Sequence, residues 1–253
     1  MERLGLKTVA LVGLGPSQSN FREELITQDR TEPIADEIWC INAAAFGLRC
    51  DRVIWMDDLV VESRRNPFCA VDLDRMGYPV LTSVAHKDLV KNSIAYPIKE
   101  AVDLSLALFN KPYLNNSVAY AICYAMLGGV ETLKLYGCDF TYPDWGFAES
   151  GRACVEAWLL AFLWKHPTVK DPNIQVASRT SLFDTTQAWS LYGYDFPPDM
   201  VTDQGENLTW IPWKISVLKK RAEELVQGGI AQNAQEIELT LKAVQRLEAE
   251  MKK

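Results

Sequence analysis

An aliphatic run that ends in a glycine turn constrains the fold of this chain more than any other segment. Residues 9–12 read Val-Ala-Leu-Val, and Gly13-Leu14-Gly15-Pro16-Ser17 follows directly. A short aliphatic, β-branched run of this kind predicts a buried strand. Two glycines allow a sharp turn and close approach of a ligand, and Pro16 suits the first turn of a following helix. The segment therefore predicts a strand–turn–helix unit.

The same alternation of strand-like and helix-like segments continues through the first two thirds of the chain. Strands separated by helix-length segments indicate an α/β fold with a doubly wound, mostly parallel, Rossmann-like sheet. The predicted strands are residues 8–12, 38–41, 52–56, 79–82, 132–136 and 174–177. The predicted helices are residues 19–27, 117–128 and 150–164.

The C-terminal segment has a different pattern. Apolar residues recur at spacings of three and four from Ile211 to Leu225 and again from Ile230 to Val244, with Gly228-Gly229 between them. This heptad-like pattern predicts a C-terminal pair of amphipathic helices. Residues 211–251 would form either a hairpin on the domain or an interface in a homo-oligomer. We therefore divide the chain into a catalytic α/β domain, residues 1–200, and a helical extension, residues 201–253.

Composition limits the class of protein. The chain has 253 residues, 48% of them hydrophobic, which is enough for a large core. No apolar run approaches the roughly 20 residues that span a bilayer, and the first residues lead straight into the first strand without a signal-peptide pattern. Six cysteines without metal-binding spacing indicate reduced, buried thiols in a cytoplasmic protein. A net charge of −7 disfavours a broad nucleic-acid surface, although a local DNA groove remains open.

Polar residues or glycines follow nearly every predicted strand. The carboxyl ends of parallel strands meet at one edge of a sheet, where doubly wound folds bind ligands. We therefore expect these segments to form one ligand site. They are Gly13 to Ser17, Asn42, Asp57-Asp58, Asp139 with Thr141-Tyr142, and Ser178 to Ser181.

Two helix starts are candidate phosphate sites, because N-terminal amides carry partial positive charge. One follows the glycine turn, and the other is Asn116-Ser117, where either residue also serves as an N-cap. The third glycine of the dinucleotide fingerprint would fall at Gln18, so the pattern indicates a single nucleotide.

Several charged residues have more than one interpretation. Arg152 is spaced to pair with Glu149 and Glu156 on one helix, or to form an acid–base and phosphate-binding pair with Glu149. Asp57 and Asp58 would hold Mg²⁺, bind a ribose or cap the next segment.

The two histidines lie in different settings. His86 follows the fourth predicted strand and is a candidate to face the site, whereas His166 reads as a solvated helix end. Neither a G-x-S-x-G elbow nor a P-loop occurs in the chain.

Three segments resemble known families. Val12-Gly13-Leu14-Gly15-Pro16-Ser17 is similar to the G-N-G-P-S opening of the Rossmann-like bacterial sialyltransferases, which use CMP-sialic acid, and of the archaeal-type hydroxymethyldihydropterin pyrophosphokinases. Cys40-Ile41-Asn42 resembles the asparagine-bearing second strand of the sialyltransferases. Residues 116–142, which include Gly137-Cys138-Asp139-Phe140, resemble the family's helix, its "lGyKeIyLxGiDf" segment and a following aromatic residue. The likeness spans roughly residues 8–183.

The resemblance implies a nucleotide pocket and an aromatic residue near the nucleotide phosphate. Tyr142 would be that aromatic residue and would help the phosphate to depart. The sequence departs from the family at Leu14, where the family has asparagine, and at Glu149 to Arg152, which lacks the sialyltransferases' catalytic histidine. The pocket residues that the resemblance implies are Gly13, Gly15, Pro16, Ser17, Asn42, Asn116, Ser117 and Asp139.

These observations predict a glycosyltransferase that moves a sugar from a nucleotide-sugar donor to a hydroxyl of a glycan, a small molecule or a hydroxylated nucleobase in DNA. The expected catalytic residues are Tyr142, Glu149, Arg152 and Asp144, with His86, Asp57 and Asp58 as other candidates for the base. We expect no tightly bound cofactor, with Mg²⁺ at Asp57 and Asp58 left open. The alternatives are a Mg²⁺-dependent pyrophosphokinase of a pterin-like alcohol and a non-catalytic nucleotide-binding or scaffold protein.

Overall fold

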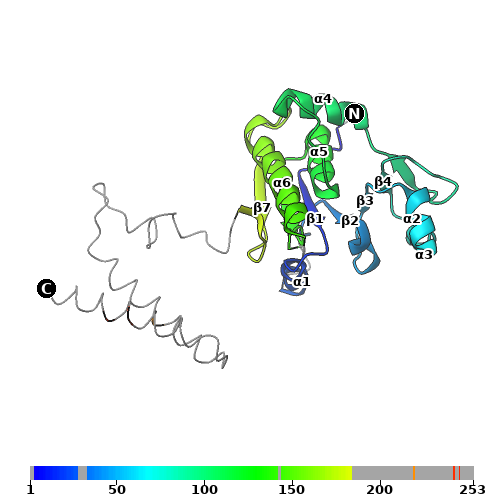
Figure 1. Cartoon of the computed structure of the whole chain (residues 1–253). Helices are drawn as coiled ribbons and strands as arrows, with labels where there is room; N and C mark the ends of the chain where they lie inside the picture. Colours follow the sequence, from blue (N-terminus) through cyan, green and yellow to red (C-terminus); the bar gives the residue numbers. More distant parts are fainter. Residues whose placement is uncertain are drawn as a thin grey trace. The chain divides into compact units, whose positions relative to one another are not determined.

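The computed structural model describes residues 3–27, 33–141 and 144–183, together with Lys219, Lys242 and Gln245. The chain divides into two compact units, Met1–Thr186 and Gln187–Lys253. The first unit is an α/β domain (Figure 1). The helix pair predicted at residues 211–251 lies outside the described residues, except for the three single positions.

Strands and helices alternate along the described part of the first unit. The strands are β1 (Thr8–Val12), β2 (Glu37–Ile41), β3 (Arg52–Trp55), β4 (Val80–Thr82), β5 (Ser93–Ala95), β6 (Thr132–Tyr136) and β7 (Asn173–Val176). The helices are α1 (Gln18–Thr27), the 3₁₀ helix η1 (Asn42–Phe46), α2 (Leu59–Arg65), α3 (Pro67–Met76), α4 (Ile98–Phe109), α5 (Ser117–Gly128) and α6 (Trp145–Lys165).

The strands form one parallel sheet. Their order is β5-β4-β3-β2-β1-β6-β7, and every neighbouring pair is parallel. The chain moves outward from β1 to β5 and then returns to the other side of β1 with β6. The strand order therefore reverses between β1 and β6, and the predicted doubly wound α/β fold is confirmed.

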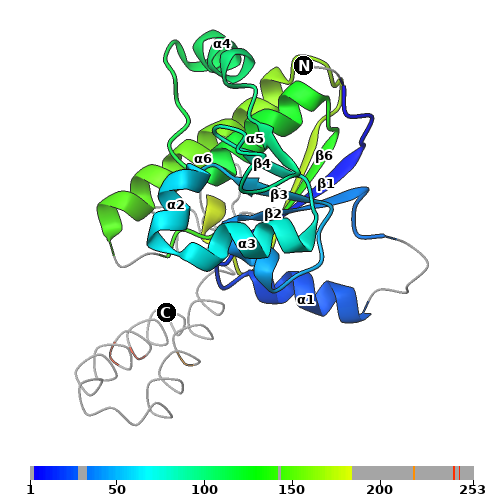
Figure 2. The same cartoon turned by 90° about the vertical axis from the view of Figure 1, so that its right-hand side faces the viewer.

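A core lies on each face of the sheet, because side chains alternate along a strand. On β1, Val9 and Leu11 belong to the cluster that contains α4, α5 and α6, whereas Ala10 and Val12 belong to the cluster that contains α1, α2 and α3. Figure 2 shows these two groups of helices on opposite sides of the strands. With both faces covered, the carboxyl edge of the sheet is where a site can open.

Several elements have the predicted bounds, and others were not predicted. The strands at residues 8–12 and 132–136 and the helix at residues 117–128 match. The helices α2 and α3 were missed because each is short and begins at a side-chain cap rather than at a clear apolar stripe. The strand β5 has three residues, too few for a visible period, and α4 buries only two of its twelve.

The helix predicted at residues 150–164 was wrong at its start. It begins at Trp145, because the Asp144 carboxylate accepts a hydrogen bond from the Phe147 N–H at 3.1 Å and caps it. An N-cap aspartate satisfies one of the unpaired donors of a first turn. As a result, Glu149 and Arg152 lie inside the helix rather than at its first turn.

All six cysteines are buried and unbridged, as the sequence predicted. Among the described residues, no helix is both long enough and apolar enough to cross a membrane.

His166 differs from the solvated helix end that the sequence suggested. Its Nδ1 accepts hydrogen bonds from the N–H groups of Thr168 and Val169, at 3.2 and 3.0 Å. Its ring packs edge-on against Phe162, with centroids 5.0 Å apart. Burial lowers the pKa of His166 below its ordinary value, because a charged imidazolium is poorly solvated there and Nδ1 must stay unprotonated to accept.

We expect the stability of the fold to fall as the pH drops below about 6.5, the ordinary histidine pKa. A group whose pKa is lowered in the fold binds its proton more readily when unfolded, so acid favours unfolding. The melting temperature of the wild type should therefore decrease more between pH 8 and pH 5.5 than that of His166→Asn. The asparagine oxygen can replace Nδ1 as an acceptor but does not titrate. Equal decreases in both proteins would contradict this role.

Candidate functional site

The carboxyl ends of β1 and β6 meet where the strand order reverses. The Gly13 N–H donates to the Tyr136 carbonyl and the Gly15 N–H to the Gly137 carbonyl, both at 2.8 Å. The glycine turn after β1 and the segment after β6 are thus joined into one edge. Doubly wound sheets bind ligands at this kind of crevice.

Ser17 and Asp139 form the strongest contact of that edge. The Ser17 N–H donates to Asp139 Oδ2 at 2.6 Å, and the Ser17 hydroxyl donates to Oδ1 at 2.8 Å. The same hydroxyl oxygen accepts from the Gly137 N–H at 2.8 Å. Ser17 is fully buried and Asp139 nearly so. Hydrogen bonds to a buried carboxylate are charge-assisted and strong, so this contact ties β1 to β6.

Glycine is required where the two segments cross. A Cβ atom on Gly13 would lie 2.3 Å from the Gly137 carbonyl oxygen, and one on Gly15 would lie 2.6 Å from Asp139 Oδ2. Neither neighbour can retreat, because the first is backbone and the second is hydrogen-bonded to Ser17. The two glycines of the motif therefore serve close packing between strands.

Three N–H groups of the glycine turn are already used within the protein. The Gly13 N–H donates to the carbonyl of Tyr136, the last residue of β6, and the Gly15 N–H donates to that of Gly137. The Ser17 N–H donates to Asp139, and Pro16 has no N–H. A phosphate therefore cannot be held by these N–H groups without breaking the β1–β6 junction. The turn instead forms the wall of a cavity.

This cavity has a volume of about 240 Å³. Asn42, in the left-handed region at φ 49°, lines it, and its Oδ1 is buried with no hydrogen-bond partner among the described residues. A buried acceptor without a partner is rare, which makes Asn42 a candidate contact for a ligand in this cavity. The lining residues are Gly13, Leu14, Gly15, Pro16, Ile41, Asn42, Val118, Gly137, Cys138, Asp139, Phe140 and Thr141.

The start of α5 reaches the same cavity through Val118. Asn116 caps the helix, since its Oδ1 accepts from the Ala119 N–H at 3.0 Å, while its Nδ2 donates to the Gly151 carbonyl at 3.2 Å. The side chain is thus a cap and a link to α6. The first N–H groups of a helix have no partner within it, so those of Ser117 and Val118 remain for an anion.

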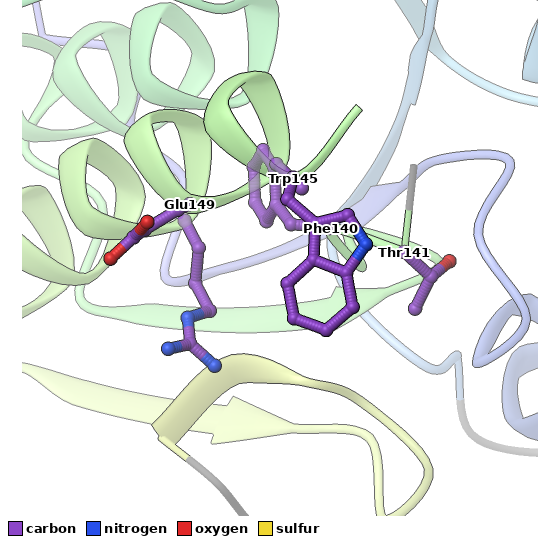
Figure 3. A pocket seen from close by; sticks show the side chains of 6 residues that line it. Phe140, Thr141, Trp145 and Glu149 are labelled. Carbon is purple, nitrogen blue, oxygen red and sulfur yellow. The ribbon is translucent and has the colours of Figure 1, made fainter. Parts of the chain in front are cut away.

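A larger cavity of about 540 Å³ adjoins the first, because Phe140 and Thr141 line both. Figure 3 shows Trp145 and Glu149 on α6 above this cavity, with Phe140 and Thr141 from the segment after β6. Ala148 and Arg152 complete its lining. This cavity therefore combines aromatic surface with a carboxylate and a guanidinium.

Phe140 is held in place at the boundary of the two cavities. Its N–H donates to the Ser181 hydroxyl at 3.1 Å, and its ring lies so close to α6 that a Cβ on Gly151 would be 2.6 Å from it. Only a residue without a side chain fits there, so Gly151 sets the distance between α6 and the β6 edge.

The charged residues predicted for catalysis occupy different positions. Arg152 Nε lies 3.9 Å from Glu156 Oε1, an intrahelical ion pair, while Arg152 also lines the larger cavity. Glu149 is exposed and lines the same cavity. The Asp144 carboxylate is engaged as the cap of α6. Tyr142 lies outside the described residues.

Asp57 and Asp58 lie after β3, and neither residue lines the two cavities. Asp58 Oδ1 accepts from the N–H groups of Val60 and Val61, and its Oδ2 lies 3.6 Å from His86 Nε2. The Val61 bond is the main reason that the pKa of Asp58 is lowered. No group of three or more His, Cys, Asp or Glu in the described part of the chain could hold a metal ion.

Trp145 is the site residue that the sequence reasoning missed. It follows Asp144, and a recognised N-cap there would have placed it in the first turn of the helix that borders the site. Asp144 was instead counted as a candidate base, which hid the start of α6.

The sequence and the structure were compared with known proteins. No family model matches the sequence, and no curated protein matches it. A structure of the sialyltransferase CstII from Campylobacter jejuni with CMP-3FNeuAc has 16% identity and a TM-score of 0.43, over 69% of this chain and 82% of that chain. A second, with cytidine-5'-monophosphate, has 16% identity and a TM-score of 0.41, over 70% and 81%.

We expect Asp139→Asn to lower the free energy of unfolding by about 1–3 kcal/mol, the cost of a buried donor without an acceptor. The asparagine side chain has one acceptor oxygen where the carboxylate has two. Its NH₂ group would therefore face one of the two Ser17 donors, the N–H or the hydroxyl, without accepting a hydrogen bond. Urea denaturation measures the change. The matched control is Asp144→Asn, which should stay near the wild-type value because asparagine caps a helix as well as aspartate does. Equal losses in the two variants would contradict the structural role of the Ser17–Asp139 contact.

Proposed function

We propose that this chain is a glycosyltransferase that moves a sugar from a nucleotide-sugar donor to a hydroxyl acceptor. One observation carries the proposal. A cavity with an unpartnered amide oxygen adjoins a larger cavity with a carboxylate and a guanidinium, at the switch point of a parallel sheet. A transferase holds a donor nucleotide beside an acceptor, and two adjoining cavities of different chemistry match that need. The motif resemblance to the sialyltransferases points the same way.

The nucleotide would occupy the smaller cavity. The N–H groups of Ser117 and Val118 at the start of α5 suit a phosphate, because a helix N-terminus attracts negative charge. Asn42 Oδ1 would accept a hydrogen bond from an N–H or O–H group of the nucleoside. Gly13, Gly15 and Pro16 would make van der Waals contacts with the nucleotide and would donate no hydrogen bonds to it.

The reaction would take place where the two cavities adjoin. Glu149 would accept the proton of the acceptor hydroxyl while the acceptor oxygen forms a bond to the anomeric carbon. The bond between that carbon and the phosphate oxygen breaks, and its electron pair stays on the departing nucleotide. Arg152 would stabilise the negative charge that develops on the phosphate. Tyr142, which follows Thr141 in the sequence, would assist the departure of the nucleotide phosphate.

A nucleotide panel tests the proposal. We expect a pyrimidine nucleotide or its sugar derivative, among CMP, CDP, UDP, ADP and ATP, to raise the melting temperature. The rise should be roughly 5–10 °C at a hundredfold excess over Kd, and it should not need Mg²⁺. The Asn42→Ala variant should reduce the shift, since it removes the acceptor. Differential scanning fluorimetry measures both.

Two outcomes of this panel would contradict the proposal. Stabilisation by ATP alone and only with Mg²⁺ would favour a pyrophosphokinase. No shift with any nucleotide would favour a scaffold protein.

The acid–base role of Glu149 gives a second prediction. We expect Glu149→Gln to lower the rate of sugar transfer by roughly 10²–10⁴-fold, the usual contribution of a general base. Nucleotide affinity should stay unchanged, because the amide keeps the shape of the side chain. The matched control is Glu131→Gln, an exposed glutamate before β6, which should keep full turnover. Release of nucleotide from the donor measures the rate. Full turnover in Glu149→Gln would remove Glu149 from the mechanism.

A further inference from the structure

Trp145 has an environment that packing alone does not explain. Its side chain is 86% exposed, although tryptophan is highly buried on average in folded proteins. Its backbone is fixed in the first turn of α6 by the Asp144 cap. The indole is therefore an exposed aromatic surface on a fixed backbone at the larger cavity (Figure 3).

Three residues of α6 converge on this cavity because of helical spacing. Glu149 and Arg152 follow Trp145 by four and seven positions, so all three lie on one face of the helix. The face presents an aromatic plane, a carboxylate and a guanidinium to one volume of about 540 Å³. Small-molecule sites commonly measure roughly 300–1,000 Å³.

We infer that the larger cavity is an acceptor subsite for a saccharide, with a pyranose ring stacked on the Trp145 indole. This inference rests on the proposed function and names the class of acceptor. A pyranose has one apolar C–H face, which suits an aromatic plane, and a rim of hydroxyls, which suits charged partners. Glu149 then lies on the same helical face as the stacking platform, in position to take the proton of a rim hydroxyl.

A second exposed tryptophan on the same helix provides the contrast. Trp164, near the other end of α6, is 77% exposed and borders a separate cavity of about 260 Å³. Apart from Lys165, that cavity is lined by apolar and aromatic residues, without a carboxylate. The arrangement of indole, carboxylate and guanidinium therefore belongs to Trp145, and Trp164 is a matched control.

The test uses the full-length chain and the variants Trp145→Ala, Trp145→Phe and Trp164→Ala. Saccharide binding is measured on a glycan array and by quenching of tryptophan fluorescence, and nucleotide binding by the thermal-shift panel. We expect Trp145→Ala to weaken saccharide binding, and to raise the acceptor KM, by roughly tenfold or more, as the loss of a tryptophan anchor does. Trp145→Phe should retain part of the binding. Trp164→Ala should bind saccharide as the wild type does, and the donor KM should stay within about twofold in all three variants.

Three results would overturn the inference. The wild type could bind no saccharide, Trp145→Ala could bind saccharide as the wild type does, or the loss in Trp145→Ala could fall on nucleotide affinity. The last result would mean that the indole stacks on a nucleobase. Failure of the proposed function would give a different result. In that case no nucleotide would raise the melting temperature, while saccharide binding would still depend on Trp145, and the saccharide subsite would be supported on its own.

Discussion

The hydrogen bonds between Ser17 and Asp139 are the contact on which the rest of the site depends. They join residues 122 positions apart and fix the segment after β6 against the turn after β1. The turn leads into α1 through the bond from the Gln18 N–H to the Gly15 carbonyl. Phe140, which borders both cavities, is the next residue after Asp139. Because the carboxylate is buried and its partners are buried with it, the contact is strong and sets where both cavities open.

That contact also decides which groups can recognise a ligand. The β1–β6 junction uses the N–H groups of Gly13, Gly15 and Ser17, so a motif that suggests a phosphate loop acts here as a packing device. In the proposed function, anion binding would fall to the start of α5, where the first N–H groups have no helical partner. Acid–base chemistry would fall to Glu149 on α6. The β1–β6 junction would thus hold the sheet together, while α5 and α6 would contact the donor and the acceptor.

Local patterns predicted the parts of the fold that depend on local sequence. The strands β1 and β6 and the helix α5 were visible because apolar residues repeat within each segment. The position of Asn42 after the second strand was visible too, but its unpartnered oxygen was not, since that depends on residues distant in sequence. The pairing of Ser17 with Asp139 leaves no local signal. The start of α6 was missed because Asp144 has two chemical interpretations, and only the hydrogen bond to Phe147 decides between them.

Hydrogen bonds connect the start of α5 to the second turn of α6. Asn116 caps α5 through Oδ1 and bonds the Gly151 carbonyl through Nδ2, while Asn115 bonds the Ser150 carbonyl at 3.1 Å. Gly151 in turn allows Phe140 to lie against α6. A phosphate at the start of α5 and a saccharide on α6 would therefore be held at a fixed separation. Transfer requires reacting atoms at near-contact distance, so in the proposed reaction the two asparagines would act by positioning the helices, without either side chain touching the substrate.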